Sequence, residues 1–218
     1  MTRIELVAEF LLLFFVLPLA YRFSPLRIPA LPLLWIAAAY AWWQLMRDAA
    51  FRRAQLWNAA PLPAHLASIL LIFAAAAFLL WLGVRLLAPQ LQWSFVRQHP
   101  VFWAIVLLAY PVLSVYPQGL IYRAFFFERY APLFPGPWAM ILASAAAFTF
   151  LHIVFRNGLA VALTFWGGLL FAARYAQTGS LAASCFEHAL YGCWLFTLGL
   201  GGYFYHGTIA AVGSVLRR

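Results

Sequence analysis

The sequence predicts an all-α membrane protein, a polytopic transmembrane bundle of about eight helices. Of its 218 residues, 67% are hydrophobic and 9% are charged, whereas a soluble domain is about half apolar and about a quarter charged. The mean hydropathy is +0.89, and the apolar residues gather in runs long enough to cross a bilayer. Because backbone groups in lipid must be hydrogen-bonded within their own segment, we expect these runs to be helices.

Eight apolar segments are expected to form the bundle, with prolines marking several of the joints between them. The expected segments are residues 4–21, 29–46, 64–88, 100–116, 137–155, 157–176, 180–198 and 203–216. Residues 118–130 either continue the fourth segment or form a separate one. We expect a single membrane domain, 1–218, with core helices at 100–205 and peripheral helices at 1–99. The later half is richer in small residues, which let membrane helices pack closely.

All 14 basic side chains are arginine, and the net charge is +9. Most arginines fall in short loops, where they set the orientation and meet anionic lipid headgroups. They form no clustered basic surface, so we expect no nucleic-acid binding. An N-terminus inside the cell places more arginines on the cytoplasmic side than outside. The cytoplasmic set is Arg3, Arg47, Arg52, Arg53, Arg129, Arg174, Arg217 and Arg218, and the outer set is Arg22, Arg27, Arg85, Arg97 and Arg156.

The few remaining special residues carry simple expectations. Cys185 and Cys193 are eight residues apart on one predicted helix, about 12 Å, which is too far for a disulfide. Three of the five acids, Glu5, Glu9 and Asp48, lie near predicted ends or loops, where we expect them to be solvated at the interface. The arginine-only basic set and the short chain fit a bacterial inner membrane.

Ionisable side chains deep inside apolar segments are costly and therefore indicate a functional site. Arg123 lies in "SVYPQGLIYRAFFFERY", and an α-helix would place Gly119 one turn before it on the same face. His152 follows Phe148 by one turn in "AFTFLHIVF". Each residue alone also has a purely structural explanation. Backbone carbonyls can accept hydrogen bonds from Arg123, and His152 can form a hydrogen bond between two helices.

A third polar position lies in "SCFEHALYG". Glu187 and His188 are neighbours and point about 100° apart on a helix, so we expect no direct pairing between them. Gly192 follows His188 by one turn. Together with Arg123 and His152, these residues predict a wet pocket between three segments, in which two imidazoles could bind a metal or hold a water molecule and an oxyanion.

The order of three motifs resembles the CPBP family of intramembrane proteases, which includes the CAAX prenyl endopeptidases and the bacteriocin-processing proteins. That family shows EExxxR, then FxxxH, then HxxxN. This chain has QGLIYR at 118–123, FTFLH at 148–152 and HALYG at 188–192. The resemblance covers roughly residues 100–205.

The resemblance implies a helical membrane endopeptidase. In the family, a first-motif glutamate is the base for water, and the histidines position water and stabilise the oxyanion. By position, Arg123, His152 and His188 carry over, with Phe148 as the supporting residue of the second motif. With two histidines and no adjacent carboxylate, we expect no cofactor and no tightly bound zinc.

The chain departs from the family pattern at two motifs. Gln118 and Gly119 stand where the first motif has glutamates, and Gly192 replaces the asparagine of the third. Losing a general base typically costs a factor of about 10²–10⁴ in rate. Three explanations are open. The chain is a natural non-catalytic member of the family, or a protein in which the glutamate was deliberately replaced. Alternatively, Glu187 or, less directly, Glu128 supplies the base.

These observations predict an intramembrane endopeptidase that cleaves a membrane-anchored protein or peptide, with weak or absent activity in this chain. The alternative is a non-catalytic binding or scaffold protein that uses the same pocket for a lipid or a transmembrane peptide. A transporter would carry an inverted repeat of broken helices, and the sequence contains no such repeat. Substrate identity and oligomeric state do not follow from the sequence.

Overall fold

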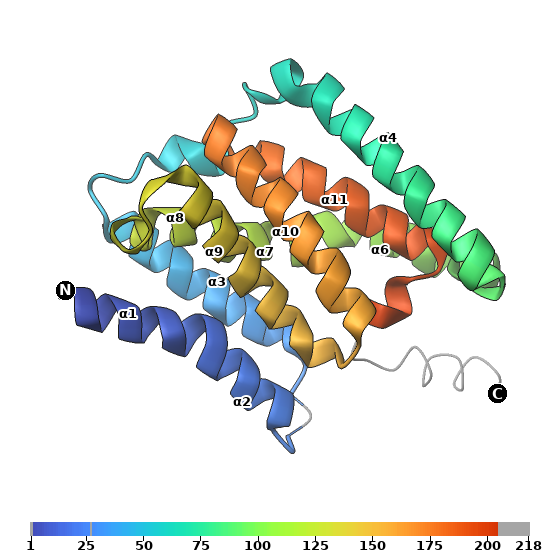
Figure 1. Cartoon of the computed structure of the whole chain (residues 1–218), viewed down its shortest axis with the longest axis horizontal. Helices are drawn as coiled ribbons and strands as arrows, with labels where there is room; N and C mark the ends of the chain where they lie inside the picture. The colour runs from blue at the N-terminus through green and yellow to red at the C-terminus, as the bar shows by residue number, and fades with distance from the viewer. Residues whose placement is uncertain (1, 27, 205–218) are drawn as a thin grey trace.

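The computed structural model describes residues 2–26 and 28–204, and these form helices joined by short turns, without a strand (Figure 1). The α-helices are α1 (Arg3–Leu11), α2 (Leu17–Phe23), α3 (Ala30–Arg47), α4 (Leu62–Leu87), α5 (Ser94–Gln98), α6 (Pro100–Tyr110), α7 (Tyr116–Gly119), α8 (Phe126–Arg129), α9 (Gly136–Leu151), α10 (Gly158–Thr178) and α11 (Leu181–Leu198). The π-helical segments are η1 (Leu12–Val16), η4 (Pro111–Val115) and η5 (Leu120–Phe125). The 3₁₀ segments are η2 (Arg53–Leu56), η3 (Pro89–Leu91), η6 (Ala131–Leu133), η7 (His152–Phe155) and η8 (Gly201–Phe204).

The predicted all-α fold of a polytopic membrane bundle is confirmed. The first seven predicted segments coincide with helices, and the open question about 118–130 is answered, because one helix runs unbroken through residues 100–129. The eighth predicted segment, 203–216, lies outside the described residues except for its first two. Five helical stretches of the described chain are long and apolar enough to cross a membrane: Arg3–Phe23, Leu62–Leu87, Pro100–Arg129, Gly136–Phe155 and Gly158–Thr178.

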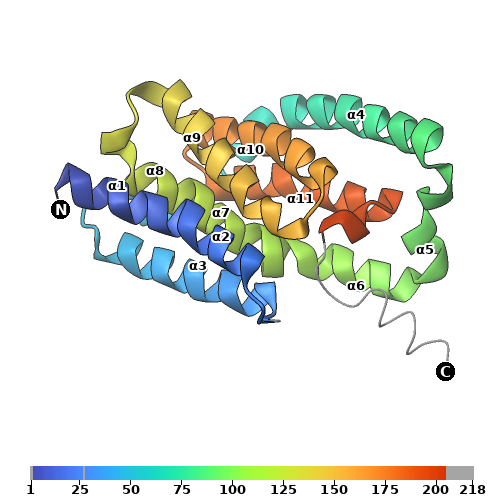
Figure 2. The same cartoon turned by 60° about the horizontal axis from the view of Figure 1, so that its bottom comes forward.

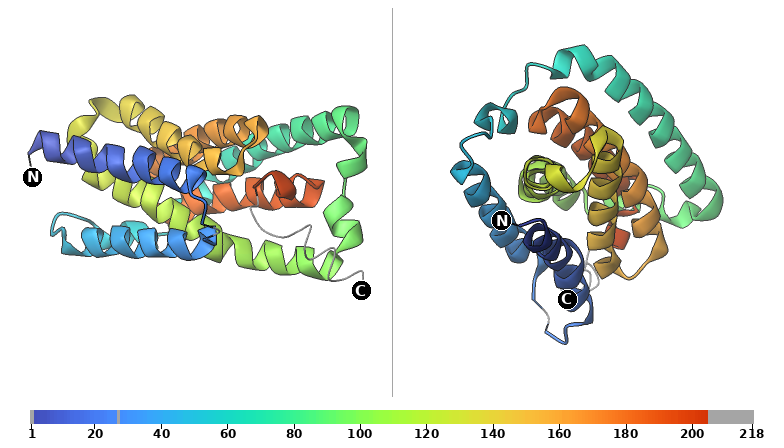
Figure 3. Two further views of the ribbon diagram at one scale, coloured as in Figure 1. Left: turned by 90° about the horizontal axis from the view of Figure 1, so that it is seen from below. Right: turned by 60° about the vertical axis from the view of Figure 1, so that its left-hand side comes forward.

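Helices α9, α10 and α11 form the centre of the bundle, and the earlier helices surround them. In Figure 1, α9 and α10 cross the middle, α4 runs along the outer side of α11, and α1 and α2 lie on the opposite flank. Figure 2 shows α5 turning the chain from α4 back to α6. Figure 3 shows the helix 100–129 running most of the length of the molecule. Its earlier part, α6, packs against α11, and its later part, α7 and η5, packs against α3.

Two prolines, Pro111 and Pro117, lie inside the long helix 100–129. A proline has no backbone N–H, so the carbonyl four residues earlier loses its helical partner, which is costly in lipid. Side chains on other helices bond to the two freed carbonyls. Trp35 Nε1 of α3 donates to the Leu113 carbonyl at 3.0 Å, and the Cys193 thiol of α11 lies 3.9 Å from the Leu107 carbonyl. The Cys193 thiol therefore makes a weak hydrogen bond to the long helix.

The acid at position 9 differs from its predicted role at the interface. Glu9 forms a salt bridge of 2.7 Å with Arg129, and its carboxylate also accepts a hydrogen bond of 3.0 Å from the Tyr130 hydroxyl. The predicted solvation of Glu9 is therefore corrected, because a partner 120 residues away supplies the compensating charge. Glu5 and Asp48 bond only to nearby backbone amides, as residues at helix ends commonly do.

Candidate active site

Arg123 lies in the π-helical segment η5 and is almost fully buried, with an exposed fraction of 1%. Its guanidinium carbon lies 4.4 Å from the ring centroid of Phe148 on α9 and 5.4 Å from that of Phe171 on α10. A π turn contains about one more residue than an α turn. In this π-helical segment, both Gly119, four residues earlier, and Gln118, five residues earlier, therefore lie about one turn from Arg123.

Both predicted histidines contact the Phe148 ring, which Arg123 also contacts. The His152 ring lies 4.6 Å from the Phe148 ring, and the His188 ring lies 5.6 Å from it. His188 also stacks on Phe171, with centroids 4.4 Å apart and an interplanar angle of 18°. We call these five residues the arginine–histidine cluster. The structure thus brings together the sequence-predicted residues of the three motifs that carry Arg123, His152 and His188.

His152 is oriented by the local geometry at the end of α9. The helix tightens there into the 3₁₀ segment η7, and the ring Nδ1 lies 2.7 Å from the Phe148 carbonyl. A carbonyl only accepts, so Nδ1 carries the proton and donates it. The neutral ring therefore keeps a lone pair on Nε2 for another partner.

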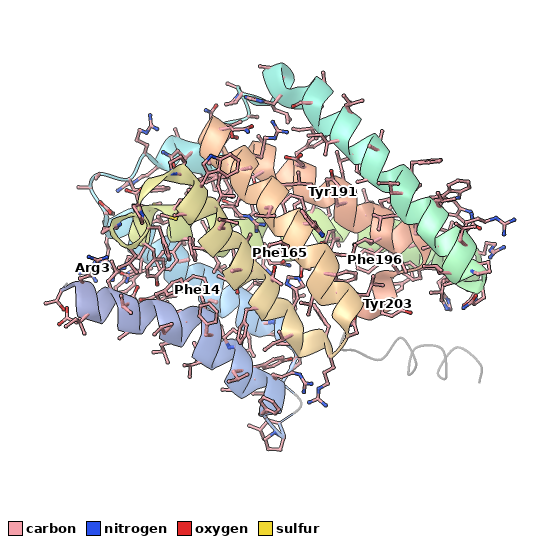
Figure 4. All side chains as sticks on the ribbon, viewed as in Figure 1. Arg3, Phe14, Phe165, Tyr191, Phe196 and Tyr203 are labelled. Carbon is pink, nitrogen blue, oxygen red and sulfur yellow. The ribbon has the colours of Figure 1, made fainter. Side chains whose placement is uncertain are left out.

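His188 is held by a residue that the sequence analysis missed. The Tyr110 hydroxyl of α6 lies 3.3 Å from His188 Nε2, whereas His188 Nδ1 is buried without a hydrogen-bond partner among the described residues. The Tyr110 ring packs on Phe196, which is labelled in Figure 4, at 5.3 Å. Gly192 makes this approach possible, because a Cβ there would overlap the Tyr110 ring. Tyr110 thus provides a polar contact where the third motif lacks a polar side chain.

Gly192→Ala is expected to displace Tyr110 and destabilise the protein by about 1–3 kcal/mol, the usual effect of overpacking. Thermal unfolding in detergent would measure the loss, and the added substitution Tyr110→Ala should reverse part of it. Gly83→Ala is the matched control, because nothing lies within 4 Å of a Cβ at that helical position. Equal unfolding temperatures for Gly192→Ala and the unchanged protein would contradict the proposed contact.

Gly119 and Gln118 occupy different environments. A Cβ at Gly119 would lie 2.5 Å from Cys185 Sγ and 3.0 Å from Leu181 Cδ1, so Gly119 is a close contact with α11. Gln118 is buried, and its Nε2 donates to Ser114 Oγ at 2.7 Å. Its Oε1 has no hydrogen-bond partner within the described part of the chain.

Neither acid considered as a substitute base hydrogen-bonds to the arginine–histidine cluster. Glu187 forms a buried salt bridge of 2.8 Å with Arg174 of α10, which also bonds to His65 of α4 at 3.1 Å. Glu128 lines a separate shallow cavity of about 320 Å³ with Asp48. Arg174 is buried, with an exposed fraction of 6%, and its expected place on the cytoplasmic side of the membrane stays a prediction.

The Arg174–Glu187 pair could have been found from the sequence. Both residues lie within about two helical turns of Gly179 and Ser180, which join two apolar helices. Opposite charges at similar heights on an antiparallel helix pair indicate an ion pair. Tyr110 carried no such signal, because its partner lies 78 residues away on a helix whose rotation the sequence does not specify.

A large apolar cavity lies beside the first motif. Its volume is about 1060 Å³, and it is bounded by α3, α4, α11 and the helix 100–129. Cys185 and Leu120 belong to its wall, and Cys185 also contacts the position of Gly119. Within residues 2–26 and 28–204, no three His, Cys, Asp or Glu side chains are grouped as metal ligands.

Comparison with known families identifies the region that holds the cluster. Residues 100–194 match the family model described as type II CAAX prenyl endopeptidase Rce1-like. No curated protein and no solved structure gave a significant match. The matched region contains the long helix 100–129 together with α9, α10 and most of α11, so it includes each motif of the arginine–histidine cluster. The match supports an intramembrane protease kind of function for an integral membrane protein. Residues 100–194 of this chain are therefore similar to the type II CAAX prenyl endopeptidase Rce1-like family, which is consistent with the CPBP group that its motifs resemble.

Proposed function

We propose that this chain is an intramembrane endopeptidase that hydrolyses a peptide bond in a membrane-anchored substrate, and that its activity is weak because the first-motif glutamates are missing. The observation that carries the proposal is the meeting of Arg123, His152 and His188 around the Phe148 ring. Buried ionisable groups from separate apolar helices are costly, and a shared polar function explains the cost.

The proposed reaction needs a nucleophilic water, a base and stabilisation of an oxyanion. The water oxygen bonds to the peptide carbonyl carbon while His152 Nε2, a weak base, takes the water proton. The C–N bond then breaks, and the leaving amine receives that proton from His152. His188 Nδ1 and the Arg123 guanidinium are donors for the oxyanion, and His152 Nε2 is an acceptor that can orient the water. No carboxylate joins these groups in the described chain, which supports slow proton removal.

The apolar cavity supports entry of the substrate from the membrane. It lies against Gly119 through Cys185, and its wall is formed largely by tryptophan, phenylalanine, alanine and leucine side chains. Because lipid tails are as apolar as this wall, an apolar anchor of a substrate can pass from the bilayer into the cavity without a hydrophobic penalty. We place the protein in the bacterial inner membrane, because its basic residues are all arginine and its chain is short.

The proposed function is tested with the purified chain in lipid vesicles and a set of membrane-anchored peptides. We expect slow appearance of new peptide termini by mass spectrometry, and loss of that cleavage in His152→Ala and in His188→Ala. Arg85→Ala is the control, because Arg85 is exposed on α4. Peptide binding without any product, unchanged by both histidine substitutions, would instead identify a binding or scaffold protein.

A further inference from the structure

The Arg123 guanidinium is a buried cation without a hydrogen-bond acceptor. Its exposed fraction is 1%, and Nε, Nη1 and Nη2 have no partner among the described residues. The Phe148 and Phe171 rings offer cation–π contacts, which satisfy the charge but none of the N–H donors. A buried charged group is normally both paired and hydrogen-bonded. The missing partner of Arg123 therefore needs an explanation.

The chain's own acids do not supply that partner. All five lie within the described residues, and each has other neighbours. Glu9 pairs with Arg129, Glu187 pairs with Arg174, Glu5 and Asp48 bond to backbone amides, and Glu128 lies beside Asp48 at a separate cavity. No acidic side chain of the described residues is therefore left for Arg123.

Further unpaired polar atoms accompany the guanidinium. His188 Nδ1 is buried without a partner, and it carries the proton when Nε2 accepts from the Tyr110 hydroxyl. His188 and Arg123 both contact Phe148 and Phe171, so the two residues share the same pair of aromatic neighbours. The Arg123 guanidinium presents a fork of N–H groups, which matches the two oxygens of a carboxylate.

We propose that Arg123 and His188 form a binding site for a small carboxylate anion. The carboxylate accepts from the guanidinium fork and from His188 Nδ1, and the Phe148 and Phe171 rings exclude water around it. The ligand is either a free carboxylate such as formate or acetate, or the C-terminal carboxylate of a peptide. The site does not require proteolysis, so it can be tested by binding alone.

Formate is the first probe, used with the full-length purified chain in nanodiscs. A ligand of three heavy atoms binds no more tightly than about the millimolar range, so the titration is carried to about one hundred times that value. We expect the melting temperature to rise with the logarithm of the formate concentration above the dissociation constant, because formate binds only the folded protein. We also expect saturation transfer from the protein to ¹³C-formate in NMR.

Two arginine variants separate this site from general salt effects. Arg123→Leu should fold, since it removes an unpaired buried charge, and it should lose both the thermal shift and the NMR signal. Arg85→Leu removes an exposed arginine and should keep both. An unchanged melting temperature and no NMR transfer in the unaltered protein would overturn the proposal. Persistence of both signals in Arg123→Leu would overturn it as well.

A peptide competition identifies the source of the carboxylate. A short apolar peptide with a free C-terminus displaces formate if the natural ligand is a peptide end, whereas its amidated form does not. If neither peptide displaces formate, the site takes a free anion. Formate binding without formate-stimulated cleavage would support the anion site while removing support for the proposed protease.

Discussion

Gln118→Glu is expected to raise the rate of peptide cleavage by about 10²–10⁴-fold, the usual contribution of a general base. Glutamate has nearly the same shape as glutamine, so the buried site can accept it without repacking. The Gln118 Oε1 atom has no hydrogen-bond partner in the described chain, which leaves one oxygen of the new carboxylate free to take a proton from water. The measurement is the initial rate of product formation in vesicles.

Two variants control the Gln118 experiment. Gln118→Met keeps the side-chain length without a carboxylate and should give no increase. Adding His188→Ala to Gln118→Glu should remove most of the gain, because a base alone cannot stabilise the oxyanion. A folded Gln118→Glu protein that cleaves no faster than the unchanged chain would refute the missing-base explanation.

The same experiment at Gly119 should behave differently. A Cβ at this position would lie 2.5 Å from Cys185 Sγ, so Gly119→Glu must move α11 or turn the thiol. We expect a smaller increase in rate and a lower melting temperature than for Gln118→Glu. Adding Cys185→Ala should restore part of the stability, and a fully stable, fully active Gly119→Glu protein would contradict this packing.

Glu187→Ala is expected to destabilise the protein by about 3–5 kcal/mol, because it leaves the Arg174 guanidinium buried without its counter-ion. The pair is 2.8 Å long, and its side chains are 6% and 1% exposed. It joins α10 to α11 directly beside His188, so its loss should also disturb the arginine–histidine cluster. Equilibrium unfolding in mixed detergent measures the change in the free energy of unfolding.

A second substitution distinguishes loss of the pair from loss of packing. Arg174→Leu combined with Glu187→Ala should be more stable than Glu187→Ala alone, because the unpaired charge is gone. Glu128→Ala removes a partly exposed acid and should stay within about 0.5 kcal/mol of the unchanged protein. A loss of less than about 1 kcal/mol for Glu187→Ala would show that Arg174 finds another partner.

The fold could be predicted from the composition, because few backbone conformations satisfy all backbone hydrogen bonds in lipid. Seven predicted segments became helices, since an apolar run in a bilayer must bond its own amides. The π-helical segment η5 was not predictable, because nothing in "LIYRAF" distinguishes a π turn from an α turn. With that segment, both first-motif positions, Gln118 and Gly119, lie about one turn from Arg123.

The candidate site was partly readable from the sequence. Arg123, His152 and His188 were recognisable, because each is a polar group in an otherwise apolar segment. Their partners were not, since Tyr110 and Phe171 are aromatic residues among many others. The roles of these residues depend on helix rotation and contact, which long-range packing decides. The division into core helices at 100–205 and peripheral helices at 1–99 stays a prediction.

The two freed carbonyls of the long helix have an evolutionary consequence. A bond between backbone groups survives almost any change of side chain, whereas the bonds from Trp35 and Cys193 each depend on a single codon. Mutations on α3 or α11 can therefore alter the helix that carries Arg123 without changing any residue of that helix. Divergence between related proteins could in this way adjust the geometry of the site from outside its own motifs.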